Sequence, residues 1–143
     1  MPWIEKHIIV EANKDVFVRL EAFAAKAEHP VTPLFGLWEE IMPTLAEESI
    51  DGILFDTYIT SFEDADQFTY AHFPFLEHAY RVLRKGGIFT YFSSEIDEYS
   101  PIHLKALQDT GFSSIEKKIC PMSPPADCLY WKSDTIVAPI IKK

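Results

Sequence analysis

Gly52-Ile53-Leu54-Phe55-Asp56-Thr57-Tyr58 is the most strand-like segment of this 143-residue chain. The apolar run Ile53 to Phe55 leads directly into Asp56, so the pattern predicts a stiff, buried strand with a carboxylate at its carboxyl end. Asp51-Gly52, just before the run, predicts a turn. In sheets of parallel strands, ligands bind at the carboxyl ends of the strands. Asp56 is therefore the first candidate for a functional side chain.

Strand-like and helical segments alternate along the rest of the chain. The pattern predicts strands near residues 8–10, 31–34, 53–55, 88–92, 114–120 and 129–141, and helices near 14–27, 39–48, 73–84 and 101–110. We expect Asn13 to cap the first helix, Lys85-Gly86-Gly87 to close the third, and Gly111 to end the fourth. Pro43 should shorten or kink the second helix. This order predicts an α/β fold in a single domain over 1–143, with a mostly parallel sheet and an antiparallel hairpin at the C-terminal end.

The composition excludes several classes of protein. The net charge is −9, which repels phosphate backbones, so we expect no nucleic-acid partner. No apolar stretch approaches the length of a membrane span, and Met1 to His7 does not resemble a signal peptide. Cys120 and Cys128 are expected to be reduced thiols. We therefore expect a cytoplasmic protein without a membrane partner.

The candidate residues allow more than one interpretation when taken from the sequence alone. Glu11 ends a predicted strand and is either a solvated loop carboxylate or an acceptor for the two hydroxyls of a ribose. Asp56 could cap a turn, bind and deprotonate an amine or guanidine, or accept a phosphoryl group beside Mg²⁺. The last role needs an acidic pair after the first strand and a Lys after a later one, which this chain lacks. The five histidines form no metal-ligating pair, so no metal site is predicted.

Several segments together resemble one known family, guanidinoacetate N-methyltransferase. The resemblance covers essentially the whole chain, and arginine N-methyltransferases share part of it, chiefly around Asp56. The segments that carry it are His7-Ile8-Ile9-Val10-Glu11-Ala12-Asn13, Gly36-Leu37-Trp38-Glu39-Glu40, Gly52 to Tyr58, Leu83-Arg84-Lys85-Gly86-Gly87, Thr90-Tyr91, Pro124-Pro125-Ala126-Asp127-Cys128 and Ile136-Val137-Ala138-Pro139-Ile140.

The resemblance implies a Rossmann-like class I methyltransferase that uses S-adenosyl-L-methionine as its cofactor. Its substrate would be guanidinoacetate or a similar small guanidino compound, as in creatine biosynthesis. Glu11 would hold the cofactor's ribose, with Ala12 and Asn13 beside it, and Gly36 and Leu37 would line the adenine pocket.

The resemblance also implies where the substrate would lie. Asp56 would grip the guanidino group next to the cofactor and act in catalysis. Ser94 and Glu95 align with the loop whose backbone contacts the substrate carboxylate, although their side chains differ from the usual pair of the family.

The chain also departs from the pattern of this family. Relatives carry a first strand with a Gly-rich loop, and a further N-terminal segment, before the point that aligns with the start of this sequence. That strand would lie between the strands that end at Glu11 and Asp56. In its absence, we expect each of these two strands to have one edge without a strand partner. A second copy in a homodimer or a complementing N-terminal chain could fill the gap, or the two strands could pair directly. The alternative to an enzyme is an inactive domain that keeps the methyltransferase fold for interaction or regulation.

Overall fold

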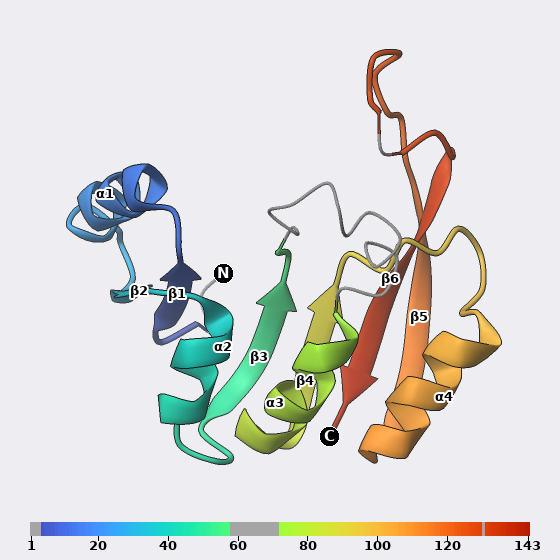
Figure 1. The fold of residues 1–143 in the computed structure, drawn as a ribbon, viewed down its shortest axis with the longest axis horizontal. Helices are drawn as coiled ribbons and strands as arrows, with labels where there is room; N and C mark the ends of the chain where they lie inside the picture. Colours follow the sequence, from blue (N-terminus) through green and yellow to red (C-terminus); the bar gives the residue numbers. More distant parts are fainter. Residues whose placement is uncertain (1–3, 58–71, 130) are drawn as a thin grey trace. The chain divides into compact units, whose positions relative to one another are not determined.

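The computed structural model describes residues 4–57, 72–129 and 131–143. The chain divides into two compact units, an N-terminal unit (Met1–Ala46) and a C-terminal unit (Glu47–Lys143). Each unit contains a sheet of its own (Figure 1).

The N-terminal unit is a strand–helix–strand motif followed by a short helix. β1 and β2 pair in parallel, from His7 opposite Val31 to Glu11 opposite Phe35. Asn13 caps α1 as predicted, because its side-chain oxygen accepts hydrogen bonds from the backbone N–H groups of Asp15 and Val16. The elements are β1 (His7–Glu11), α1 (Lys14–Ala24), β2 (Val31–Phe35), α2 (Trp38–Ile41) and a 3₁₀ turn (Met42–Thr44).

The C-terminal unit is a four-stranded mixed sheet with the strand order β3-β4-β6-β5. β3 and β4 are parallel, and β6 is antiparallel to both of its neighbours. The elements are β3 (Ile50–Phe55), a 3₁₀ turn (Phe73–Phe75), α3 (Leu76–Val82), β4 (Leu83–Tyr91), α4 (Pro101–Thr110), β5 (Ser114–Pro121) and β6 (Thr135–Lys142).

Alternate residues of β4 form the centre of the hydrophobic core. Phe89 and Tyr91 are two positions apart, so their side chains lie on the same face of the sheet. The Phe89 ring packs against Phe75, just before α3, and against Phe112, just after α4, at centroid distances of 5.7 and 6.2 Å. Tyr91 contacts His103 of α4. α3 and α4 therefore cover the same face of this sheet (Figure 1).

The pairing of β4 with β6 stops at a proline. In the described residues these strands pair at Ile88↔Lys142 and Phe89↔Ile141. Two positions further on, the same register would bring Tyr91 opposite Pro139, whose backbone nitrogen carries no hydrogen to donate. The backbone ladder between the two strands therefore ends where the carboxyl end of β4 begins.

The predicted turn at Asp51-Gly52 is wrong, because both residues belong to β3. The exposed Asp51 carboxylate forms an ion pair with Arg84 at 2.9 Å, and Gly52 lies opposite Ile88 of β4. The register shifts between Ile50 and Gly52, so the strand continues through a local irregularity.

The predicted glycine cap of the third helix is also wrong. α3 ends at Val82, and the next five residues, Leu83 to Gly87, begin β4. Gly86 has a left-handed φ of 79°, and its N–H donates to the carbonyl of Lys143. Gly87 lies so close to neighbouring backbone that an added Cβ would be 2.9 Å from the carbonyl oxygen of Arg84. Gly86 thus allows the backbone to bend within the strand, and Gly87 allows neighbouring backbone to approach closely.

Other predicted boundaries differ by a few residues. The first helix ends at Ala24 and not near residue 27, and the helix predicted over 39–48 ends early, in a turn that contains Pro43. The last strand begins at Thr135 and not at residue 129. By contrast, α4 has the predicted bounds, with Gly111 in the left-handed conformation at its C-terminal cap.

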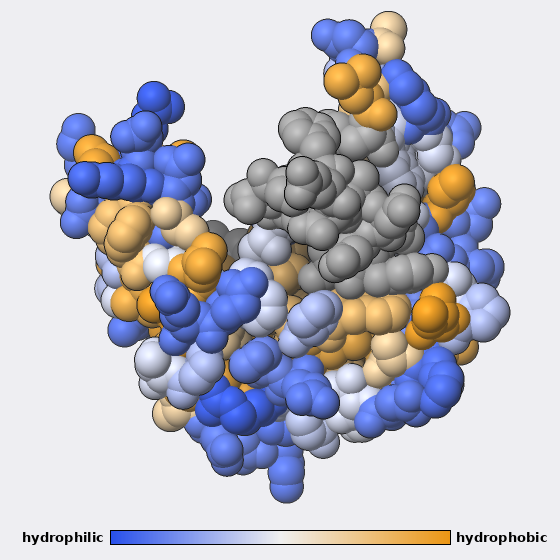
Figure 2. Space-filling view, in the orientation of Figure 1, coloured by the Kyte–Doolittle hydropathy of each residue, from blue (hydrophilic) through white to orange (hydrophobic). Residues whose placement is uncertain are grey.

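The two units differ in how much apolar surface they bury. Of the buried hydrophobic residues that the structure describes, only Met42 belongs to the N-terminal unit. Apolar side chains of α1 such as Val18 and Phe23 are each 57% exposed, and Figure 2 shows hydrophobic patches among the mostly hydrophilic surface. Among the described residues, no helix is long and apolar enough to cross a membrane.

Candidate functional site

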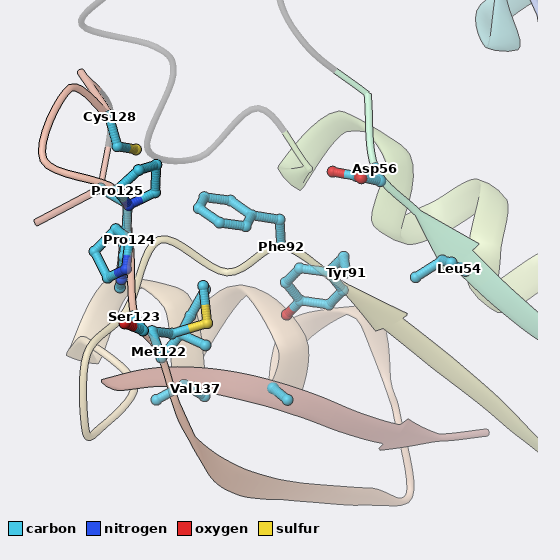
Figure 3. A pocket seen from close by; sticks show the side chains of 13 residues that line it. Leu54, Asp56, Tyr91, Phe92, Met122, Ser123, Pro124, Pro125, Cys128 and Val137 are labelled. Atoms are coloured by element: carbon cyan, nitrogen blue, oxygen red, sulfur yellow. The ribbon is translucent and has the colours of Figure 1, made fainter. Parts of the chain in front are cut away.

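Asp56 lies in the wall of a cavity within the C-terminal unit. It follows the last residue of β3, is exposed, and lines a cavity of about 510 Å³. Figure 3 shows its carboxylate oxygens on the side that faces Phe92, which lines the same cavity. A volume of this size suits a small-molecule ligand. The strand-end position that the sequence predicts for Asp56 is confirmed.

The rest of the cavity wall is mostly apolar. Two aromatic residues come from the end of β4, and the opposite wall comes from β6 and from the segment that joins β5 to β6 (Figure 3). Among the lining residues that the structure describes, Asp56 is the only one with a charged side chain. The lining residues are Leu54, Asp56, Tyr91, Phe92, Met122, Ser123, Pro124, Pro125, Cys128, Trp131, Ile136, Val137 and Ala138.

A hydrogen-bonded group of buried polar side chains lies behind Tyr91. The Tyr91 hydroxyl is 2.6 Å from Nε2 of His103, and Nε2 of His72 is 3.1 Å from the same atom. On the other side of the ring, Nδ1 of His103 is 3.2 Å from the Glu95 carboxylate. Glu95 also accepts the backbone N–H of Ser100, the N-terminal cap of α4. This chain of contacts ties the cavity wall to α4.

Burial sets the charge of this group. It lowers the pKa of His72 from 6.5 to about 3, with a smaller contribution from His103. Burial also lowers the pKa of His103, although the Glu95 carboxylate opposes this effect. For Glu95, burial alone would raise the pKa, but hydrogen bonds from Ser100 and His103 outweigh it and lower the pKa. Burial raises the pKa of Tyr91. Both histidines are therefore neutral at pH 7, whereas Glu95 is ionised.

The loop after β4 is fixed by contacts to β6. The buried Ser93 hydroxyl donates to the carbonyl of Val137 at 2.6 Å, and the N–H of Val137 donates to the carbonyl of Glu95 at 2.8 Å. The Glu95 N–H in turn donates to the Ser93 hydroxyl oxygen. Between them, Ser94 has a φ of 58°, which is uncommon for a residue with a side chain. The loop is thus held in a strained shape of the kind that often accompanies a binding site.

The other predicted site residues lie in the N-terminal unit, at the carboxyl ends of β1 and β2. Glu11 ends β1, and one of its carboxylate oxygens accepts the N–H of Asn13 at 2.7 Å. The exposed Ala12 lies between them, and the side-chain oxygen of Asn13 is engaged in capping α1. A carboxylate offers about four acceptor positions, so Glu11 keeps capacity for further hydrogen bonds.

Gly36 lies directly beside Glu11. Its N–H donates to the Glu11 carbonyl, and its φ of 147° strongly favours glycine. An added Cβ would also press on Ile41 at 3.2 Å. The next residue, Leu37, precedes α2 and is 51% exposed, so it offers apolar surface. A carboxylate with acceptor capacity beside an exposed aliphatic side chain is a set of groups that fits the ribose and adenine of an adenosyl cofactor.

Sequence reasoning missed most of the cavity wall. Tyr91 and Phe92 could have been found by the same strand-end rule that selected Asp56. Trp131 could not, because it was assigned to the last strand and is instead part of the irregular segment before β6. His103 carries no local signal, since its partner Glu95 is eight residues away and depends on the fold of α4.

Comparison with known proteins decides the family. The family model for guanidinoacetate N-methyltransferase matches residues 2–143. The chain belongs to the guanidinoacetate N-methyltransferase family. A curated relative of this family member is protein arginine N-methyltransferase 2 of Yarrowia lipolytica, which is 29% identical over 90 residues. These residues are 62% of this chain but only 18% of the relative, so the chain spans a small part of that protein's length.

Solved structures establish the fold of this guanidinoacetate N-methyltransferase family member. A SAM-dependent methyltransferase from Archaeoglobus fulgidus superposes with a TM-score of 0.59 at 13% identity, covering 95% of this chain and 75% of the other. A possible histamine N-methyltransferase from Thermotoga maritima has a TM-score of 0.56 at 22% identity, covering 96% and 73%. The predicted class I methyltransferase fold is therefore confirmed.

Proposed function

We propose that this chain carries the substrate site of an S-adenosyl-L-methionine-dependent N-methyltransferase that acts on guanidinoacetate or a similar small guanidino compound. The observation that carries the proposal is the Asp56 carboxylate, exposed at the end of β3 in a cavity wall whose other described residues carry no charge. Family membership and fold support the reaction class.

The chemistry of Asp56 suits a guanidinium. A guanidinium has a pKa above about 12 and keeps its proton at pH 7. A carboxylate can accept two of its N–H groups in a bidentate fork, one of them from the nitrogen that reacts, which orients that nitrogen. When that nitrogen forms its bond to carbon, it must lose a proton, and the carboxylate can accept it. Phe92 and the other apolar residues of the described wall offer the guanidinium no competing charge.

The residues of the N-terminal unit fit an adenosyl cofactor. Glu11 would accept the two ribose hydroxyls, and Gly36 and Leu37 would lie against the adenine. When bound, this cofactor supplies a sulfonium methyl group as the electrophile of an in-line displacement. Such a reaction depends mainly on the positioning of the two reactants.

Substitution of Asp56 tests the proposal. In an assay of labelled methyl transfer to guanidinoacetate, Asp56→Asn should lower kcat/KM by on the order of 100-fold or more, because the amide can neither accept the proton nor balance the charge. Asp51→Asn, on the same strand but exposed and paired with Arg84, is the matched control and should stay within about twofold of the wild type. Equal activity in the two variants would refute the role of Asp56.

Protein arginine is a second candidate substrate, favoured by the similarity to the Yarrowia lipolytica enzyme. Any guanidine can engage a carboxylate such as Asp56, so competition decides between the two. At equal concentrations, guanidinoacetate should suppress methylation of an arginine-containing peptide. If the peptide instead suppressed methylation of guanidinoacetate, protein arginine would be the favoured substrate.

An inactive domain is the remaining alternative. It would bind no S-adenosylhomocysteine in calorimetry, even at millimolar concentration.

Association with a second chain is a further part of the proposal. In the described residues β1 pairs only with β2, and β3 only with β4, so each has one edge without a strand partner. Such edges can accept a strand from another copy or from a complementing N-terminal chain. Size-exclusion chromatography with light scattering tests self-association, since a monomer at high concentration would contradict the homodimer.

A further inference from the structure

One buried imidazole joins the two ends of the segment that follows β4. His103 of α4 has no exposed surface. Its Nε2 is 2.6 Å from the Tyr91 hydroxyl, and its Nδ1 is 3.2 Å from Oε1 of Glu95. The ring therefore bridges the residues between them, 92–94. Tyr91, His103 and Glu95 together form an imidazole clamp.

The charges of these groups fix the direction of each hydrogen bond. An ionised carboxylate can only accept, so Nδ1 of His103 carries the proton that is donated to Glu95. The imidazole is neutral, so Nε2 has a lone pair and accepts the hydroxyl hydrogen of Tyr91. Oε1 of Glu95 also accepts the N–H of Ser100 at 2.9 Å, at the N-terminal cap of α4. The clamp therefore ties both ends of the segment to one helix.

The clamped segment carries part of the cavity wall. Phe92 lines the cavity, on the side that the Asp56 carboxylate faces (Figure 3). Its ring packs edge-on against Trp131, with 5.6 Å between centroids. Ser94 has a φ of 58°, a conformation that persists only when its surroundings hold it. Without the clamp, we expect the segment to relax and Phe92 to leave its place in the wall.

We propose that His103 is a positioning residue of the substrate site: through Tyr91 and Glu95 it holds Phe92 in the wall that the Asp56 carboxylate faces. This inference rests on the proposed function and adds a residue that lies behind the cavity wall. Hydrogen bonds to β6 hold the same segment from one side, and the clamp holds it from the side of α4. Positioning matters here because a misplacement of about 1 Å can lower the rate about 100-fold.

Two substitutions of Glu95 separate its hydrogen bonds from its charge. Glu95→Gln keeps an oxygen that can accept from both His103 and Ser100, whereas Glu95→Ala removes it. In labelled methyl transfer to guanidinoacetate, Glu95→Ala should lower kcat/KM by about tenfold to a hundredfold, and Glu95→Gln should stay within about threefold of the wild type. Glu98→Ala, in the same loop but exposed and paired with Lys117, is the control and should stay within about twofold. An unchanged kcat/KM in Glu95→Ala, or an equal loss in Glu95→Gln, would overturn the inference.

Double variants separate positioning from a general loss of stability. Tyr91→Phe releases the other end of the clamp, so its loss and that of Glu95→Ala should not multiply when the two are combined. In a Phe92→Ala background, Glu95→Ala should change kcat/KM by less than about twofold, because the residue that the clamp positions is gone. Losses that multiply, or a full Glu95→Ala loss without Phe92, would refute the role of His103.

The indole of Trp131 reports on the wall without catalysis. Its Nε1–H is buried, with no hydrogen-bond partner among the described residues, and its ring packs on Phe92. In a ¹H–¹⁵N spectrum, where Trp131→Phe identifies the resonance, Glu95→Ala should shift this N–H and Glu95→Gln should not. If this pattern is seen but the wild type methylates no guanidine, the clamp stands and the proposed reaction is refuted. If Asp56→Asn abolishes transfer while neither the resonance nor kcat/KM responds to Glu95→Ala, the proposed function stands and the inference is wrong.

Discussion

At the scale of single residues, the position of each polar side chain follows from its immediate neighbours. Asp56 is exposed because it is the first residue after a strand whose last member, Phe55, is buried against Phe75 at a centroid distance of 4.1 Å. His72 is polar and yet 3% exposed, because it stacks on Tyr91 and shares a hydrogen bond with His103. The first position can be predicted from sequence, whereas the second depends on distant partners.

The buried His72 predicts an acid-sensitive fold. An unfolded chain binds a proton at His72 below pH 6.5, whereas the folded protein does so only near pH 3, so acid favours unfolding. Between pH 7.5 and 5.5 this single group should remove about 1.4 kcal/mol of unfolding free energy. The depressed pKa values of His103 and Glu95 act in the same direction.

Denaturant titrations at the two pH values measure this effect. His72→Phe keeps the ring stacked on Tyr91 but cannot be protonated, so its loss of stability between pH 7.5 and 5.5 should be smaller than that of the wild type by about 1.4 kcal/mol. His29→Gln, in the N-terminal unit, is the control and should leave the wild-type dependence unchanged. A His72→Phe variant with the full pH dependence would contradict the assignment.

At the scale of elements, the sequence predicts those segments whose ends carry their own signals. α4 is correct because Ser100 caps its start and Gly111 ends it. The third helix is wrong at its C-terminal end because Gly86 and Gly87 look like a helix cap in isolation. Only the tertiary structure reveals that Gly86 bonds to Lys143 and that a Cβ on Gly87 would lie 3.2 Å from the carbonyl oxygen of Asp51 in β3. Local glycine patterns do not distinguish a cap from a close approach between distant segments.

The two glycines of β4 should respond differently to alanine. At Gly87 a new Cβ would lie 2.9 Å from the Arg84 carbonyl oxygen, so Gly87→Ala should destabilise the fold by about 2–3 kcal/mol through overpacking. At Gly86 no atom lies within 4 Å of the new Cβ, and the cost should be about 1 kcal/mol, from the left-handed φ alone. Urea unfolding followed by circular dichroism measures both values, and the reverse order would contradict this account.

At the scale of the whole molecule, apolar burial is concentrated in one unit. The fully buried Phe89, Leu107 and Ile141 all belong to the C-terminal unit, whereas α1 has no buried residue. Stability therefore differs between the units, and the N-terminal unit should open at a lower free energy. Sequence patterns predicted the helix near residues 14–27 but could not reveal how incompletely its apolar side chains are buried.

Limited proteolysis tests this difference in stability. Brief digestion should first cleave within residues 1–46 and leave a longer-lived fragment that begins near Glu47 and keeps β4 and β6, because the buried core lies there. Mass spectrometry identifies the fragments, and hydrogen exchange should rank β4 above β1 in protection. A first stable product that retains residues 1–46 and loses part of β4–β6 would contradict the prediction.

Pro139 has a consequence for the width of the binding cavity. In the described residues, the backbone pairs that join β4 to β6 end before this proline, so fewer main-chain bonds hold β6 to the chain after β4 where both flank the cavity. The Ser93 hydroxyl on the carbonyl of Val137 and the N–H of Val137 on the carbonyl of Glu95 join them there. We therefore expect the tolerance of this site for longer or shorter acids to depend on a serine hydroxyl that, beside one main-chain bond, acts as a spacer between the two segments.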